Sequence, residues 1–125
     1  MLELEDVGFH GHHAPLLENV SASIGEGTLS EITAPTGDAR TALALICSGR
    51  AAPDSGRVLI HGAAETARLR RSTALIDSPG ITAPEHHMRA RDLISESLGL
   101  IPRRRGTRIP ATAQWIAEQE VADIA

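Results

Sequence analysis

The chain has 125 residues and a formal net charge of −4, so it is large enough for one domain with a modest core. Its overall charge gives no reason to expect a nucleic-acid partner or a membrane surface as a ligand. Only Phe9 and Trp115 are aromatic, and the lone Cys47 excludes an internal disulfide. No apolar run is long enough to span a membrane, and the acidic, alternating N-terminus is unlike a signal peptide. We therefore expect a cytoplasmic protein.

Two strands are predicted at the N-terminus. Apolar and acidic residues alternate over residues 2–7, and apolar and polar residues alternate over residues 17–24. The segment between them contains Gly11, Pro15 and three histidines, which is typical of a turn. The pattern therefore predicts an antiparallel hairpin or meander.

A third strand is predicted over residues 28–33, which are rich in β-branched side chains. A tight turn follows over residues 34–41, and an apolar, mostly buried helix is predicted from Thr41 to Ser48. Gly49 is placed to end that helix. Strand, turn and helix in this order are the setting in which a phosphate-binding loop occurs.

The rest of the chain alternates between short strands and helices. We expect a turn at residues 52–56, strands at 57–60 and 73–76, a helix at 63–71 with exposed arginines, and a turn at 77–80. A helix start is predicted at residues 82–85, helical spacing runs from Met88 to Leu98, a mobile loop covers 102–110, and a last helix covers 111–124. Its predicted buried side chains are Trp115, Ile116, Val121 and Ile124. The order predicts an α/β fold with an antiparallel flank.

The turn at residues 34–41 departs from the phosphate-loop pattern G-x-x-x-x-G-K-S/T. Ala34 and Ala39 replace the two glycines, Arg40 replaces the lysine, and Thr41 keeps the hydroxyl. By pattern alone the stretch is either a decayed phosphate loop or an ordinary turn. Its residues are Ala34, Pro35, Thr36, Gly37, Asp38, Ala39, Arg40 and Thr41.

Several segments together resemble the N-terminal half of the ATP-binding domain of ABC transporters, a P-loop NTPase family. Residues 2–9 look like the first strand of that family, and residues 16–21 with the Gly25-Glu26-Gly27 turn look like its second strand. The Ala34-Pro35-Thr36-Gly37 run is similar to the start of the Walker A loop. The segment Pro53-Asp54-Ser55-Gly56, continuing to Gly62, follows at the family's spacing.

The resemblance implies a P-loop NTPase-like core with an N-terminal antiparallel flank and a C-terminal helical segment. Residues 1–80 would form the N-terminal part of the nucleotide-binding core, and residues 81–125 would begin the helical subdomain. On the family's pattern the chain ends before the signature loop, the Walker B acidic pair and the switch histidine. We therefore expect a truncated domain or a fragment.

The same resemblance makes residues 34–41 the candidate site for ATP with Mg²⁺, where Thr41 would hold the metal. Gly37 and Thr41 keep family features, and the helix N-terminus provides partial positive charge. Three changes oppose binding: a methyl at Ala39, a longer and planar cation at Arg40, and the negative charge of Asp38. The alternative is a turn in which Asp38 or Thr36 caps the helix and no ligand is needed.

Other candidate groups favour structural interpretations. Asp77, at the family's Q-loop position, could hold a metal but is more typical of a turn before Ser-Pro-Gly. The histidines fit no zinc pattern. Cys47 is expected to be a small core residue. The run at residues 103–105 could touch acidic partners or lipid headgroups, although a solvated loop is favoured.

Two functions follow from the resemblance. In the first, the chain is an incomplete or degenerate ATP-binding subunit of an ABC-type transporter, peripheral to the inner face of the cell membrane, which binds nucleotide at residues 34–41 without hydrolysing it. Its partner would be a membrane subunit, a second ATP-binding domain or another copy of itself, and not nucleic acid. In the second, it is a non-catalytic interaction module that keeps the fold. A domain cut short, with an uncovered sheet edge, is the third interpretation.

Overall fold

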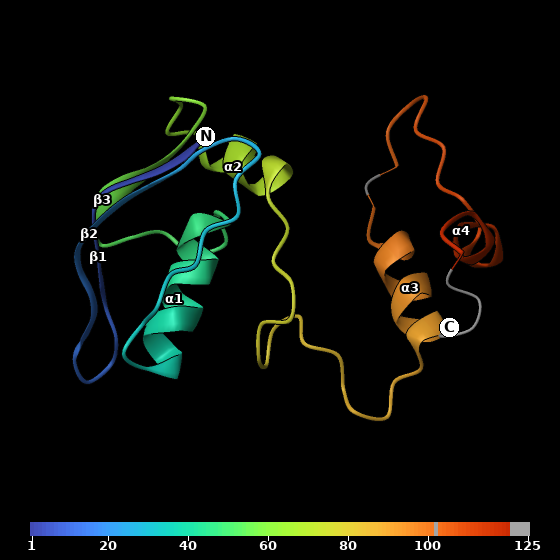
Figure 1. Ribbon diagram of the computed structural model, residues 1–125, viewed down its shortest axis with the longest axis horizontal. Helices are drawn as coiled ribbons and strands as arrows, with labels where there is room; N and C mark the ends of the chain where they lie inside the picture. The colour runs from blue at the N-terminus through green and yellow to red at the C-terminus, as the bar shows by residue number, and fades with distance from the viewer. Residues whose placement is uncertain (102, 121–125) are drawn as a thin grey trace. The chain divides into compact units, whose positions relative to one another are not determined.

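The structure is a computed structural model that describes residues 1–101 and 103–120. Along the chain it contains β1 (Leu2–His10), β2 (Pro15–Ile24), α1 (Gly37–Cys47), β3 (Ser55–Ile60), α2 (Thr66–Ser72), α3 (Ala90–Gly99) and α4 (Thr112–Glu118) (Figure 1). The chain divides into two compact units, Met1–Ala83 and Pro84–Ala125. The predicted division into a nucleotide-binding core over residues 1–80 and a helical subdomain over residues 81–125 stays a prediction.

The three strands form one antiparallel sheet in the order β2-β1-β3. The central strand places Leu4 between Ala22 of β2 and Val58 of β3. The predicted N-terminal hairpin is therefore confirmed. The strand predicted at residues 57–60 is also confirmed, and it begins two residues earlier, at Ser55.

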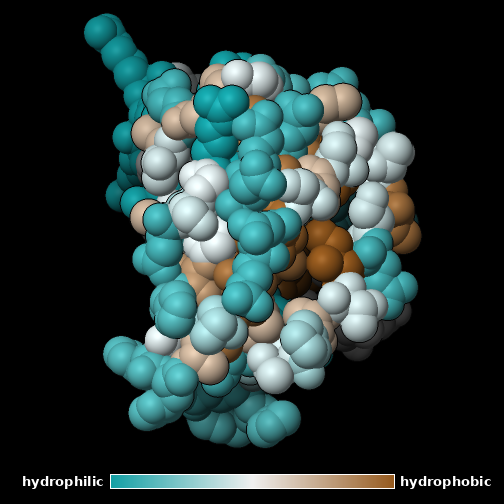
Figure 2. Space-filling view, turned by 90° about the vertical axis from the view of Figure 1, so that its left-hand side faces the viewer, coloured by the Kyte–Doolittle hydropathy of each residue, from teal (hydrophilic) through white to brown (hydrophobic). Residues whose placement is uncertain are grey.

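The core of the first unit lies between this sheet and α1, which runs along one side of the strands (Figure 1). The buried residues of α1 recur at the three- and four-residue spacing of one helix face. They are Ala39, Ala42, Leu43 and Ile46. Viewed from the left-hand side of Figure 1, hydrophilic side chains predominate, and hydrophobic atoms show in a recess between them (Figure 2). The fold is a small α/β arrangement, as the sequence predicts.

The end of α1 follows the predicted glycine signal. Gly49 has φ of +68°, its N–H donates to the carbonyl of Ile46 at 3.0 Å, and the N–H of Arg50 donates to the carbonyl of Leu45 at 2.8 Å. This pair of bonds satisfies carbonyls that the last helical turn would otherwise leave unpaired. A side chain at Gly49 would also meet Arg70 of α2, so the glycine allows the two helices to approach closely.

Two predicted strands are wrong. Residues 28–33 and 73–76 have no regular structure, and within them Leu29 is 101% exposed and Ile76 is 82% exposed. A strand is stable only when its N–H and C=O groups pair with a neighbour, and no such neighbour is formed by the described parts of the chain. The β-propensity of these residues was therefore not sufficient to form a strand without a pairing partner.

The helices differ from prediction mainly at their ends. The helix predicted at residues 63–71 is α2, which begins at Thr66, and its Arg68, Arg70 and Arg71 are exposed as expected. The predicted helix start at residues 82–85 is wrong, because the chain makes turns there, and α3 begins only at Ala90. In the turn at residues 78–83, the N–H groups of residues 81–83 all donate to the single carbonyl of Ser78. The successive carbonyl acceptors of a helix are therefore not used here.

The second unit contains α3 and α4, whose lengths differ from the prediction. The predicted apolar face of α3, formed by Leu93, Ile94 and Leu98, is half-buried. In α4, Ile116 is buried and Trp115 is half-buried. The other two predicted positions, 121 and 124, lie outside the described residues, as does residue 102. Among the helices that the structure describes, none is long and apolar enough to cross a membrane.

Candidate phosphate-binding loop

Residues 34–41 lead directly into α1, and Thr36 caps the start of this helix. Thr36 has extended backbone angles, and its hydroxyl oxygen accepts a hydrogen bond from the Ala39 N–H at 3.1 Å. The Thr36 carbonyl accepts from the Arg40 N–H at 3.1 Å. Of the two candidate caps, Thr36 therefore takes this role, and Asp38 lies in the first helical turn.

The helix begins earlier than expected, at Gly37 instead of Thr41, so five of the eight residues of the loop stretch are helical. Ala39 is only 1% exposed, which places its methyl group in the core. Alanine is the best helix former, and a buried methyl adds contacts with the sheet. Both effects favour a wound helix start over an open turn. The methyl of Ala39 also faces the core, away from the solvent side where a phosphate would approach.

The start of α1 keeps two backbone donors. The N–H groups of Gly37 and Asp38 make no hydrogen bond to any part of the chain that the structure describes. Unpaired N–H groups at a helix N-terminus carry partial positive charge and can receive an anion. The first turn therefore has some capacity to contact phosphate oxygens, although Thr36 already occupies the third donor, on Ala39.

Two opposite charges lie beside these donors. Arg40 and Asp38 are both exposed, and neither forms an ion pair with another described residue. The guanidinium of Arg40 lies close to Gly37, because a Cβ built on that glycine would be 3.8 Å from Arg40 Nη2. The arginine is thus placed to attract an anion at the helix start. The carboxylate of Asp38 would compete with that anion for the same positive end of the helix.

The remaining residues of the stretch are spread out. Thr41 is half-buried one turn further along α1, and Ala34 is half-buried against the core. Pro35 is exposed at the bend before the cap. The structure therefore brings Gly37, Asp38 and Arg40 together at the helix start. Around the part of the chain that is described, no group of three His, Cys, Asp or Glu side chains is arranged to hold a metal ion.

Two other candidates have structural settings. Asp77 has φ of +53° and begins a turn that contains Gly80 at φ of +71°, as predicted for a turn-forming aspartate. Cys47 packs against the core, and burial raises the pKa of its thiol to about 11. This thiol is therefore protonated and unreactive near neutral pH.

Sequence reasoning placed the segment at residues 53–62 in the family pattern but did not identify what its residues do. The N–H of Asp54 donates to the Gly8 carbonyl at 2.8 Å, and the Asp54 carboxylate accepts from the His10 N–H at 2.6 Å. Gly56 has φ of +73°, and a Cβ there would collide with the carbonyl oxygens of Glu5 and Asp6. These residues attach the start of β3 to β1. The Asp-Ser-Gly turn signal was the clue to this attachment.

Three known proteins show what the chain is similar to. Residues of this chain are 31% identical over 114 positions to an iron(III) ion import ATP-binding protein, FbpC, of Mesorhizobium japonicum, covering 85% of the chain. They are 36% identical over 66 positions to the taurine import ATP-binding protein TauB of Pseudomonas syringae, covering 51% of the chain. Identity is 29% over 62 positions to an intermembrane phospholipid transport ATP-binding protein, MlaF, of Escherichia coli, covering 50%.

All three relatives are ATP-binding proteins of transport systems. The chain is homologous to ABC transporter ATP-binding subunits. It matches 31%, 25% and 23% of the length of FbpC, TauB and MlaF respectively, so it spans between about a quarter and a third of these relatives. No family model matches the chain. The resemblance seen in the sequence is thereby confirmed at the level of the family.

Proposed function

We propose that this chain provides part of a nucleotide-binding domain in an ABC-type transporter and contacts the phosphates of ATP at residues 34–41. One observation carries the proposal. The N-terminus of α1 presents unpaired N–H groups of Gly37 and Asp38 beside the guanidinium of Arg40, at the place where the family's Walker A loop is expected. A helix start with a neighbouring cation is a suitable environment for phosphate oxygens.

The contact with nucleotide is weak. Thr36 occupies the Ala39 N–H that an open phosphate loop would present to its ligand, and the Asp38 carboxylate repels a triphosphate. At an effective dielectric typical of a surface site, that repulsion is about 1 kcal/mol or more. Mg²⁺ bound with ATP would partly neutralise this charge. The hydroxyl of Thr41 is the group of this chain that would hold the metal.

Hydrolysis is not expected from this chain alone. Arg40 is longer and planar where the family uses a compact lysine ammonium, and it cannot place its charge in the same way. The signature loop and the Walker B acidic residues of the family have no counterpart within the 125 residues of this sequence. We place the protein at the cytoplasmic face of the membrane, attached through a membrane subunit or a second ATP-binding domain.

Calorimetric titration with ATP, with and without Mg²⁺, tests the binding. We expect a dissociation constant in the high micromolar range that weakens several-fold for Arg40→Ala. Arg50→Ala, at the opposite end of α1, is the matched control and leaves affinity unchanged. The double change Ala39→Gly and Arg40→Lys restores the second glycine and the lysine of the family motif and should strengthen binding about tenfold. Equal binding by the wild type and the Arg40→Ala variant would contradict the assignment of the site.

A phosphate-release assay tests the absence of hydrolysis. The wild-type chain should release no more phosphate from labelled ATP than a control without protein. Release clearly above that control, and abolished by Arg40→Ala, would show that this chain is an ATPase.

The second candidate function is a non-catalytic interaction module, and a specific observation favours it. Large apolar side chains of the first unit are exposed on segments without regular structure, and they are Leu29, Ile32, Ile76 and Ile81. A partner that covered these apolar groups would gain free energy by removing them from water. No heat at millimolar ATP, together with a dimer or a complex in light scattering, would support this function. A monomer that binds ATP would support the first.

A further inference from the structure

An exposed apolar pair follows α3 in the second unit. Leu100 is 76% exposed and Ile101 is 40% exposed, directly after the helix ends at Gly99. Neither side chain contributes to the buried core of the chain. Two adjacent exposed aliphatic side chains gain free energy when an apolar phase or a partner removes them from water.

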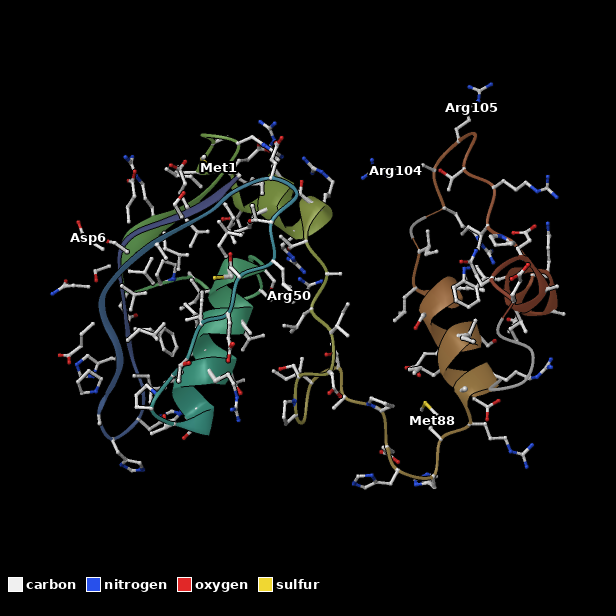
Figure 3. The ribbon with its side chains drawn as sticks, viewed as in Figure 1. Met1, Asp6, Arg50, Met88, Arg104 and Arg105 are labelled. Carbon is white, nitrogen blue, oxygen red and sulfur yellow. The ribbon has the colours of Figure 1, made fainter. Side chains whose placement is uncertain are left out.

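A basic run lies beside this pair. Arg103, Arg104, Arg105 and Arg108 are exposed, and none of them forms an ion pair with a described residue, whereas Arg57 and Arg71 pair with Glu5 and Glu65. The side chains of Arg104 and Arg105 extend away from α3 and α4 at the tip of the connecting loop (Figure 3). No acidic residue occurs between Glu96 and Glu118. The segment is therefore strongly positive although the whole chain is acidic.

A cleft opens at the base of the same loop. It has a volume of about 500 Å³, and its lining combines one guanidinium, that of Arg103, with three hydroxyls and an apolar wall. The hydroxyls belong to Ser95, Thr107 and Thr112, and Ile109 is part of the apolar wall. A guanidinium and hydroxyl donors suit phosphate oxygens, and an apolar wall suits the glycerol and upper acyl carbons beside them.

We propose that this basic loop, formed by Leu100, Ile101 and Arg103–Arg105 with Arg108, binds the surface of a membrane that contains anionic phospholipid. The headgroup phosphate meets Arg103 in the cleft, the other arginines lie among neighbouring headgroups, and Leu100 and Ile101 enter the interface. An apolar pair next to a basic run is the composition of segments that lie in this interface. An acidic protein segment would match the arginines but would leave the aliphatic pair without a partner. The contact is made by this chain directly and does not depend on the nucleotide proposal.

Sedimentation of the full chain with lipid vesicles tests the proposal. Vesicles of phosphatidylcholine mixed with phosphatidylglycerol should bind the chain, and vesicles of phosphatidylcholine alone should not. Binding should weaken as salt is raised, because surface charges are screened over a shorter distance. The single tryptophan, Trp115 on α4, gives a second measurement, since its fluorescence should change on binding. No binding to the anionic vesicles would overturn the proposal.

Matched variants separate binding by this basic loop from a general effect of positive or apolar groups elsewhere on the chain. The double change Arg104→Gln and Arg105→Gln should weaken partitioning about tenfold or more, while Arg68→Gln with Arg71→Gln, two exposed arginines of α2, should change it less than twofold. Leu100→Asn should weaken binding several-fold, and Leu29→Asn, at an even more exposed leucine of the first unit, should not. Equal losses in either pair would contradict the assignment.

Two further experiments distinguish a membrane from other ligands of the basic loop. Inorganic phosphate should displace the chain from vesicles no better than chloride at the same ionic strength. Displacement by phosphate alone would mean that the cleft is a site for soluble anions. Binding of a polyglutamate peptide with no vesicle binding would show an acidic protein partner. Either result would overturn the membrane proposal, and circular dichroism of each variant would confirm that it remains folded.

Discussion

Two segments of the first unit carry the family resemblance, and the structure uses them differently. Residues 53–62 form a turn and strand that are attached to β1 by backbone bonds and by Asp54. Residues 34–41 lead into α1, whose start is capped by Thr36, and five of these eight positions lie in the helix. The first segment matches the family pattern closely, whereas the second has alanine at both glycine positions of the pattern and arginine at the lysine position.

The difference separates residues that the fold needs from residues that a ligand needs. Gly56 adopts a left-handed backbone in contact with carbonyl oxygens of β1, so a side chain there would force the sheet to move. Ala39 lies in a helical turn with its methyl in the core, where alanine is favourable. The observed conformation thus requires the glycine of the first segment and not the second glycine of the Walker A pattern.

The largest expected effect comes from Gly56→Ala. The added Cβ would overlap the carbonyl oxygens of Glu5 and Asp6, and alanine at this φ adds strain of about 1–2 kcal/mol. Together with the displaced backbone, we expect a loss of about 3 kcal/mol or more in the free energy of unfolding. This is a large share of the stability of an ordinary domain. Urea denaturation followed by circular dichroism measures it.

Gly62→Ala is the matched control for that change. Gly62 has φ of +75°, almost the same as Gly56, but nothing lies within 4 Å of the position that a Cβ would occupy. The control therefore carries the backbone strain without the collision, and its loss should be about 1–2 kcal/mol. If the two variants lost equal stability, close contact with β1 would not be the reason for the glycine at position 56.

A smaller effect is expected from Thr36→Ala. Removing the hydroxyl leaves the Ala39 N–H unpaired, which should lower the free energy of unfolding by about 1 kcal/mol. Thr36→Ser keeps the acceptor and should lose much less. The alanine variant also frees a donor at the helix start, so calorimetry should show ATP affinity that is unchanged or slightly higher. A large loss of ATP affinity would mean that the Thr36 hydroxyl contacts nucleotide instead of capping the helix.

The sequence was sufficient to predict the parts of the fold that depend on local contacts. Alternation predicted the β1–β2 hairpin, and the glycine signal at position 49 predicted the end of α1. It failed at residues 28–33 and 73–76, where a strand depends on a neighbour that local pattern cannot provide. The burial of Ile116 was predicted from helical spacing, because that spacing is a local property.

The candidate site was predictable in place but not in conformation. Strand and helix signals identified residues 34–41 as the entry to a helix, and Thr36 was one of two expected caps. The early start at Gly37 was missed, because it depends on burial of Ala39 against the sheet, which is a tertiary contact. The composition cue for the basic loop was visible in the sequence. Its cleft and its exposed Leu100 and Ile101 emerged only from the structure.

The smallest effect is expected at the other end of α1, where Cys47 is packed against the core. Burial raises the pKa of this thiol from 9.0 to about 11, so the native chain should react with a thiol reagent at pH 8 about a hundredfold more slowly than the unfolded chain. Between pH 9 and 11 the folded state holds the proton that the unfolded state has lost. The free energy of unfolding should therefore fall as pH rises through this window, and it should be unaffected below it.

The composition of the chain makes this pH dependence simple to assign to one group. The sequence contains no lysine and no tyrosine, so Cys47 is the only side chain whose ordinary pKa lies near that window. Cys47→Ala should remove the pH dependence between 9 and 11 while leaving the start of α1 and its ATP affinity unchanged. A dependence that persisted in this variant would assign the effect to another group. Loss of ATP affinity would show that the buried end of α1 is coupled to its exposed start.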